Sequence, residues 1–194
     1  SAPIAFEPGK CRLSSVRVVD GISGAEVPFQ LSNIVFGRAD FVNFCVITFP
    51  ATLQKFQNKV YATASDGGEG YALPKYDTDL ALETDKATGE QILSNSLVAF
   101  RIPPNGAHQL RDGENGPPPV AALRGPDGLW FGKGQLVSSR KPQSYTCEQT
   151  ETGALFKEFK ITYKFPEEKG KTEQETLPQA EYELTLRLYS HRDY

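Results

Sequence analysis

Four carboxylates share one side of a short segment and are the residues best placed for acid–base or cation chemistry. Leu80 and Leu82 take the opposite parity, so an extended segment would turn the acids away from a core. Such a stripe can bind a hard cation or supply the acid and base of a glycosidase. It is also typical of a charged, solvent-facing edge strand, which we favour. Asp77 and Asp79 remain candidate ligand-binding residues. The four acids are Asp77, Asp79, Glu83 and Asp85.

Aromatic side chains offer a second route to a ligand. Trp130 is the only tryptophan and follows a glycine-rich turn, while Tyr76 and Tyr145 lie in or near expected loops. Exposed aromatic rings stack on sugar faces or anchor a protein partner. The plainer alternative is that Trp130 and Phe131 point to opposite faces of a strand, one of them into the core. We predict ligand contacts at Trp130 and Tyr76.

Neither histidine has a catalytic partner that can be read from the sequence. His108 lies in the proline-rich stretch 103–119, and His191 lies in a terminal segment. There is no Gly-x-Ser-x-Gly elbow and no Cys-x-x-Cys, His-x-x-x-His or calcium-loop spacing. We therefore predict no catalytic residue, no metal and no cofactor, and favour a protein that is not an enzyme. His108 is kept as a candidate ligand contact because long loops are often functional.

Three cysteines allow at most one disulfide within the chain. Cys45 sits inside the apolar run Phe41–Phe49, where a buried thiol behaves as a small hydrophobe. Cys11 and Cys147 have more polar neighbours and lie near expected strand ends. We predict a Cys11–Cys147 disulfide with Cys45 free. The competing possibility is a buried bridge from Cys45 to another sheet.

The elements that must position these residues are strands. The stretches 155–165 and 181–188 alternate apolar and polar residues with a period of two, which is typical of strands with one face on a core. Lys157 is the one departure from the apolar side of the first stretch. The polar faces carry both signs, which suits cross-strand charge pairing. The charged residues are Lys160, Lys164 and Arg187 with Glu158, Glu181 and Glu183.

Shorter strands complete an all-β pattern. The run Phe41–Phe49 is apolar on both faces and predicts a central strand. Turn signals such as Gly125–Gly128 separate further strands, and the stretch Pro103–Pro119 predicts a long surface loop. We predict an antiparallel β-sandwich, jelly-roll-like, or a barrel, with long Pro/Gly-rich loops and little helix. A chain of 194 residues fits a single domain over 1–194.

Composition excludes several classes of protein. Hydrophobic residues make up 39% and charged residues 23% of the chain, as in globular proteins, and no apolar run approaches the length of a membrane helix. A net charge of −3 lacks the excess of Lys and Arg that nucleic-acid binding requires. The chain has no Met, and the start Ser1–Ala5 resembles the product of signal cleavage, so we expect a secreted protein.

Three functional hypotheses follow. The leading one is a secreted, non-enzymatic surface or extracellular binding protein that recognises a glycan or protein partner. We expect a monomer or weak homodimer, with no nucleic-acid partner and no membrane span. One alternative is an extracellular carbohydrate-active enzyme, a glycosidase or lyase of jelly-roll type. The other is a β-barrel carrier of a small apolar ligand. Its lining would include residues such as Phe29, Phe44, Phe100 and Leu184.

Overall fold

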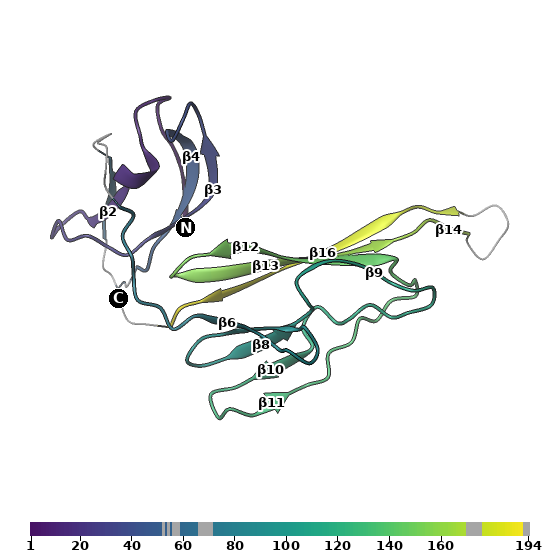
Figure 1. Cartoon of the computed structure of the whole chain (residues 1–194). Helices are drawn as coiled ribbons and strands as arrows, with labels where there is room; N and C mark the ends of the chain where they lie inside the picture. The colour runs from purple at the N-terminus through teal and green to yellow at the C-terminus, as the bar shows by residue number, and fades with distance from the viewer. Residues whose placement is uncertain (52, 54, 56–58, 66–71, 170–175, 192–194) are drawn as a thin grey trace. The chain divides into compact units, whose positions relative to one another are not determined.

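The computed structural model describes residues 1–194 except 52, 54, 56–58, 66–71, 170–175 and 192–194 (Figure 1). Strands are the main regular structure of the described residues and form several antiparallel sheets. The described residues contain no α-helix, only the 3₁₀ turn η1 (Leu13–Ser15). No helix in this part of the chain is long and apolar enough to cross a membrane. The all-β prediction is confirmed.

The chain divides into two compact units. The first unit contains Ser1–Thr78 and the short segment Gly153–Leu155. The second unit contains Asp79–Thr152 and Phe156–His191. This division does not decide whether the chain is one domain, and the single domain over 1–194 stays a prediction.

The first unit contains a three-stranded sheet in the order β1–β4–β3 and the strand pair β2–β5. The middle strand β4 is flanked on both sides, which confirms the prediction of a central strand within Phe41–Phe49. Its side chains Val42, Cys45 and Ile47 are fully buried in the core of this unit. The strands are β1 (Ala2–Ala5), β2 (Arg17–Asp20), β3 (Gln30–Phe36), β4 (Val42–Thr48) and β5 (Tyr61–Ala64).

The second unit contains two antiparallel sheets whose side chains meet in one hydrophobic core. The five-stranded sheet has the order β11–β10–β8–β7–β6, the four-stranded sheet has the order β16–β13–β12–β9, and β14 pairs with β15. Leu93 and Ile102 of the larger sheet are buried in the same cluster as Phe159, Ile161 and Tyr163 of the smaller one. The strands are β6 (Ala81–Thr84), β7 (Gln91–Ser94), β8 (Ala99–Ile102), β9 (Gly106–Gln109), β10 (Ala122–Arg124), β11 (Trp130–Phe131), β12 (Ser144–Thr152), β13 (Phe156–Phe165), β14 (Glu168–Lys169), β15 (Thr176–Leu177) and β16 (Ala180–Tyr189).

The two stretches with the clearest alternation form β13 and β16, and these strands pair along their whole length. Phe156 faces Tyr189 at one end and Phe165 faces Ala180 at the other, with no shift of register between. The predicted charge pairing across the strands is confirmed. The ion pairs are Lys160–Glu183 at 2.7 Å, Lys164–Glu181 at 3.4 Å and Arg187–Glu158 at 2.5 Å.

The prediction of one long loop over Pro103–Pro119 is wrong in part. Gly106–Gln109 forms β9, which pairs with β12 at the edge of the four-stranded sheet. Gly106 has a φ of 105°, a conformation that glycine adopts readily and other residues do not. The chain can therefore begin a strand two residues after Pro104. The many prolines and glycines of this segment favoured a loop and hid the strand.

The predicted disulfide between Cys11 and Cys147 is not formed, because all three cysteines are buried free thiols. Cys147 lies in the core of the second unit, whereas Cys11 and Cys45 lie in the core of the first. Apolar burial raises the pKa of Cys45 to about 11 and that of Cys147 to about 12, which keeps both as unreactive thiols. The polar neighbours of Cys11 and Cys147 in the sequence did not reveal which way their side chains point.

Thiol titration tests this arrangement. After unfolding in guanidinium chloride without reductant, the chain is expected to react with Ellman's reagent at all three cysteines. The folded protein should react far more slowly, because each thiol is 2% exposed or less. A variant with an added surface cysteine, Thr150→Cys, provides the fast-reacting control. A single reactive thiol per unfolded chain would show that a disulfide is present.

Candidate functional site

A short hairpin at one edge of the five-stranded sheet carries Trp130. Its strands β10 and β11 are joined by the predicted turn at Gly125–Gly128. Gly128 N donates to Gly125 O at 3.1 Å, and Gly125 N donates to Leu129 O at 3.3 Å. Gly128 has a φ of 78°, so the turn needs glycine there.

The register of this hairpin decides which side chains share a face. Trp130 lies opposite Arg124, and Phe131 lies opposite Leu123. Facing residues of antiparallel strands project to the same side, so Trp130 and Phe131 contribute to two different surfaces. Both rings are exposed, Trp130 to 38% and Phe131 to 49%. The expectation that one of them is buried in the core is therefore wrong.

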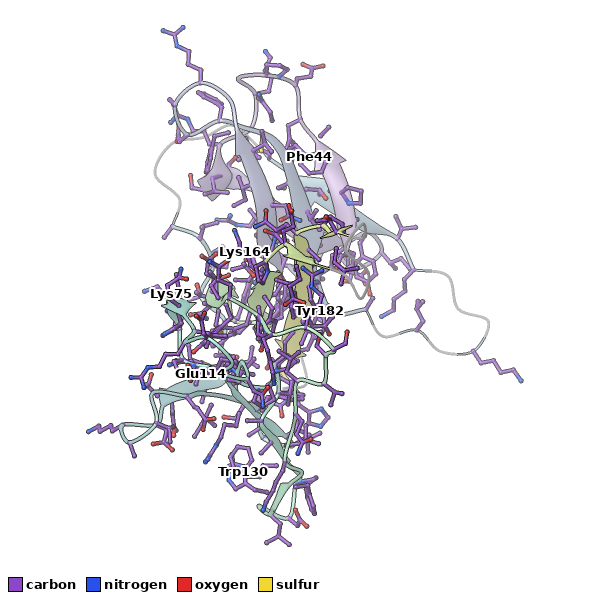
Figure 2. The ribbon with its side chains drawn as sticks, turned by 90° about the vertical axis from the view of Figure 1, so that its right-hand side faces the viewer. Phe44, Lys75, Glu114, Trp130, Lys164 and Tyr182 are labelled. Atoms are coloured by element: carbon purple, nitrogen blue, oxygen red, sulfur yellow. The ribbon has the colours of Figure 1, made fainter. Side chains whose placement is uncertain are left out.

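Two guanidinium groups lie against the indole of Trp130. Figure 2 labels this tryptophan among the side chains. The guanidinium carbon of Arg101 is 5.0 Å from the ring centroid, and that of Arg124 is 5.4 Å away, both within cation–π range. Arg101 lies 3.6 Å from a carboxylate oxygen of Glu90 and 4.0 Å from one of Asp85, beyond hydrogen-bond distance. Arg124 has no carboxylate at ion-pair distance in the described part of the chain. Both groups therefore keep donors for a ligand.

The apolar face of the five-stranded sheet extends beyond the part that is buried. Leu93, Phe100, Leu123 and Phe131 lie opposite one another across successive strands. Leu93 is fully buried and Phe100 is half-buried, but Leu123 is 40% exposed and Phe131 is 49% exposed. Leu129, at the base of the turn, is 61% exposed. The sheet thus ends in an uncovered apolar edge.

A groove of about 590 Å³ lies elsewhere in the second unit, beside the first residues of β16. Leu136, Phe165 and Tyr182 supply apolar parts of its lining. Arg140 also lines the groove, but its guanidinium donates to the carbonyls of Pro166 and Pro178, which flank β13 and β16. That guanidinium ties a loop to the residues flanking the sheet, so these donors are already used within the chain.

The carboxylate of Asp79 is engaged in hydrogen bonds with other segments of the second unit. Its carboxylate accepts hydrogen bonds from Ser190 Oγ at 2.7 Å, Ser96 N at 3.0 Å and His191 N at 3.0 Å. Burial raises the pKa of Asp79, but these hydrogen bonds outweigh it and hold the pKa well below its ordinary value. The side chain fastens the segment after β16 to the start of β6. A permanently ionised, fully engaged carboxylate is poorly suited to proton transfer.

The other acids of the predicted stripe do not form a paired site with it. Asp77 is exposed and belongs to the first unit. Glu83 is exposed on β6, where it lies opposite Ile92. Asp85 Oδ1 accepts the backbone N–H groups of Ala87 and Thr88 at 2.9 and 3.3 Å, which shapes the turn between β6 and β7. The charged-edge interpretation fits this arrangement better than an acid–base pair does.

Tyr76 belongs to the first unit and His108 to the second. Tyr76 packs edge-on against Phe29 in the first unit, with ring centroids 6.1 Å apart, and burial raises the pKa of its hydroxyl. His108 lies on β9 in the second unit and stacks on Tyr145 at 4.7 Å. Its Nε2 is 3.2 Å from Asn105 O. Both rings are half-buried and engaged in packing within their own unit.

The predicted site residues of the second unit are not brought together. Within the second unit, Trp130 lies at the β11 edge of the five-stranded sheet, Asp79 lies next to β6 at the opposite edge, and His108 lies in the other sheet. Sequence reasoning identified Trp130 but missed Arg101 and Arg124. The turn at 125–128 could have revealed Arg124, because a tight hairpin there places it opposite Trp130. Arg101 lies on β8, which is more distant from Trp130 in the sequence, and no sequence pattern indicated that the two side chains would meet.

Comparison of this chain with protein-family models, with curated proteins and with solved structures found no match.

Replacing Asp79 tests its structural role. Asp79→Ala is expected to lower the free energy of unfolding by about 2 kcal/mol near neutral pH, because hydrogen bonds to a charged group are lost. The pKa of Asp79 is lower in the folded chain, so this contribution is present above the ordinary value of 3.8 and is lost as the pH falls below it. Urea denaturation at about pH 7 and about pH 2 should show the gap between wild type and variant closing in acid.

The matched control for this measurement is Asp112→Ala. Asp112 is exposed in a loop of the same unit, so its loss should change the free energy of unfolding by less than about 0.5 kcal/mol. A gap between Asp79→Ala and wild type that is equally large at both pH values would contradict the ionised, hydrogen-bonded state of Asp79.

Proposed function

We propose that this chain is a non-enzymatic binding protein whose partner is another protein, held on the hairpin of β10 and β11. The observation that carries the proposal is an exposed aromatic and aliphatic edge beside two guanidinium groups with unused donors. We call this the hairpin surface. It consists of Arg101, Leu123, Arg124, Leu129, Trp130 and Phe131.

The residue types of the hairpin surface favour a protein interface. Tryptophan, phenylalanine and arginine are enriched where protein partners make their strongest contacts. Leu129, Trp130 and Phe131 are consecutive and all exposed, which is costly in water unless a partner covers them at times.

A glycan fits this surface less well than a protein does. Sugars stack on an open aromatic face, but the guanidinium groups of Arg101 and Arg124 already lie within 5.4 Å of the Trp130 centroid. The aliphatic side chains of Leu123 and Leu129 would find few matching groups on a hydrated sugar, whereas they would pack well against apolar side chains. The partner is therefore expected to be a protein.

The charge of the hairpin surface indicates what the partner presents. The guanidinium donors of Arg101 and Arg124 would match carboxylates, with which arginine forms paired hydrogen bonds. A complementary surface combines Asp or Glu with apolar side chains that cover Leu129 and Phe131. Binding would remove water from the arginines beside the indole. Their interactions with the indole and with the partner's carboxylates would then become stronger.

The two alternatives predicted from the sequence gain less support. A glycosidase needs two carboxyl groups across a groove, but Asp79 and Asp85 are occupied by backbone N–H groups. A carrier needs one enclosed apolar interior, whereas Phe29 packs in the core of the first unit and Phe100 against that of the second. The shared core of two sheets supports a β-sandwich for the second unit, while a jelly-roll or barrel stays a prediction, as does secretion.

Selection from a library of displayed random peptides tests the proposal on the full chain. Enriched peptides are expected to combine acidic with aromatic or aliphatic residues. Trp130→Ala and Phe131→Ala should each weaken binding of a selected peptide at least about tenfold, because truncation of a central aromatic contact typically costs 1–2 kcal/mol or more. Titration by fluorescence polarisation measures the effect.

Phe36→Ala is the matched control, because Phe36 on β3 of the first unit has the same 49% exposure as Phe131. It should leave peptide binding unchanged. Binding that survives both hairpin variants would place the site elsewhere. A glycan array read with wild type and Trp130→Ala distinguishes the other ligand class, since glycan binding lost in that variant would contradict a protein partner.

A further inference from the structure

The strand β16 forms one edge of the four-stranded sheet, and no described strand pairs with its outer side. All of its sheet pairing is with β13. In residues 180–188, no described group forms a hydrogen bond with the other side of the strand. At its end, Asn95 Nδ2 donates to Tyr189 O at 2.9 Å. The free edge therefore offers a row of backbone N–H and C=O groups to an added strand.

This edge lacks several features that commonly protect edge strands from pairing. β16 has ten residues, contains no proline and pairs with β13 without a register shift. The other edge strands of the three larger sheets are shorter: β1, β6, β9 and β11 have four residues or fewer, and β3 has seven. β3 is also irregular, with register shifts and Asn33 at a φ of 49°. Short or irregular edges resist the addition of a strand, whereas β16 does not.

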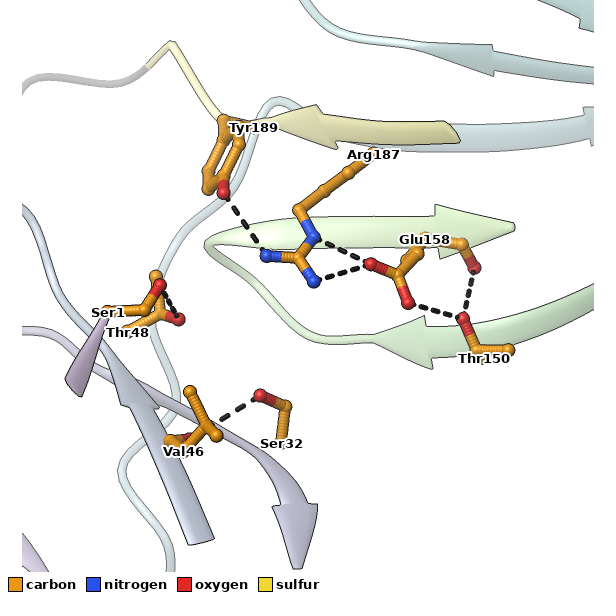
Figure 3. A network of polar contacts seen from close by, with 8 residues as sticks. All are labelled: Ser1, Ser32, Val46, Thr48, Thr150, Glu158, Arg187 and Tyr189. Carbon is orange, nitrogen blue, oxygen red and sulfur yellow. Dashed lines mark hydrogen bonds and ion pairs between the residues drawn. The ribbon is translucent and has the colours of Figure 1, made fainter. Parts of the chain in front are cut away.

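Charges on the solvated face of this sheet alternate in sign from strand to strand. Glu158 on β13 binds Arg187 on β16 at 2.5 Å, and Thr150 on β12 donates to the same carboxylate at 2.8 Å (Figure 3). Arg187 also donates to Tyr189 Oη at 3.3 Å. Nearer the start of β16 the signs are reversed, with Lys160 on β13 and Glu183 on β16. β16 thus carries its acids at one end and its base at the other.

We propose that β16 pairs with β16 of a second copy of this chain, antiparallel and with the two-fold axis at Thr185. Identical strands in parallel would bring like charges together, Glu183 against Glu183. In the antiparallel arrangement, Glu183 lies opposite Arg187 of the second copy, which continues the alternation of charge across the interface. The four-stranded sheets of the two copies become one continuous sheet.

The apolar side of β16 also becomes better covered in this arrangement. Tyr182 is 44% exposed, and Leu184 and Leu186 are half-buried in the single chain. With the axis at Thr185, Leu184 lies opposite Leu186 of the second copy and Tyr182 lies opposite its Leu188. The dimer therefore gains backbone hydrogen bonds, charge pairing and apolar contact from one strand.

Cysteine cross-linking tests the proposed register directly. Residues directly opposite across an antiparallel pair have Cα atoms about 4.5–5.5 Å apart, within reach of a disulfide. Thr185→Cys should therefore form a covalent dimer with mild oxidant, seen on non-reducing gels. Thr150→Cys is the matched control, because Thr150 is also exposed but lies on β12, which β13 separates from β16. The native thiols are buried. Cross-linking of the wild-type protein under the same conditions shows whether they react.

Sedimentation of the uncross-linked protein provides a second measurement. Wild type is expected to dimerise as its concentration rises from about 1 μM to about 1 mM, the range expected of a weak interface. Thr185→Glu should raise the dimer Kd at least about tenfold, since two carboxylates would meet at the axis. The fold of each chain should tolerate this change, because Thr185 is exposed and lies opposite Lys160 on β13.

A wild type that stays monomeric over this range would overturn the proposal. So would cross-linking of Thr185→Cys no faster than that of Thr150→Cys, or a dimer that Thr185→Glu leaves unchanged. These outcomes are independent of the hairpin surface, because β16 and β11 belong to different sheets. Peptide binding at the hairpin surface could occur in a protein that stays monomeric. Dimerisation could equally occur in a Phe131→Ala variant that no longer binds the peptide.

Discussion

The antiparallel pairing of β13 with β12 on one side and β16 on the other is the interaction on which the second unit depends. It places Phe159, Ile161 and Tyr163 in the core and turns the residues between them to the opposite face of the sheet. Because side chains alternate with a period of two, a slip of one residue would exchange the two faces. Every apolar residue of β13 would then lose its burial, so the register is strongly determined. The ion pairs with β16 add to this constraint only weakly, because they are exposed to solvent.

The exposed hairpin is a consequence of how the opposing sheet is built. The row from Leu93 to Phe131 continues the apolar face of that sheet past the buried core, where Leu123 and Phe131 are no longer covered. A soluble chain would ordinarily place polar residues there, since each exposed apolar side chain forgoes the gain of burial. Leu123 and Phe131 instead lie exposed at an edge, beside Arg101 and Arg124. For this reason we propose that this part of the molecule binds a partner.

Several polar residues hold the chain together, including two acids of the stripe that the sequence predicted. Asp79 accepts hydrogen bonds from two backbone N–H groups and a serine hydroxyl, and Asp85 shapes a turn. Arg140 fixes a loop to the residues flanking β13 and β16. Satisfying backbone groups in this way keeps irregular segments ordered, because an unpaired buried group is costly. Such residues look like catalytic candidates in a sequence, since the types that stabilise turns are the same types that transfer protons.

The sequence by itself determined the local elements: the alternating strands β13 and β16, the central strand β4, the turn at 125–128 and the charges that pair across strands. These follow from side-chain periodicity and turn chemistry, which act between near neighbours or along one strand. Only the tertiary structure decided that Cys11 and Cys147 lie in different cores, that β9 interrupts the proline-rich stretch, and that Arg101 reaches Trp130. Each of these depends on which strands become neighbours, and that is settled by packing of the whole chain.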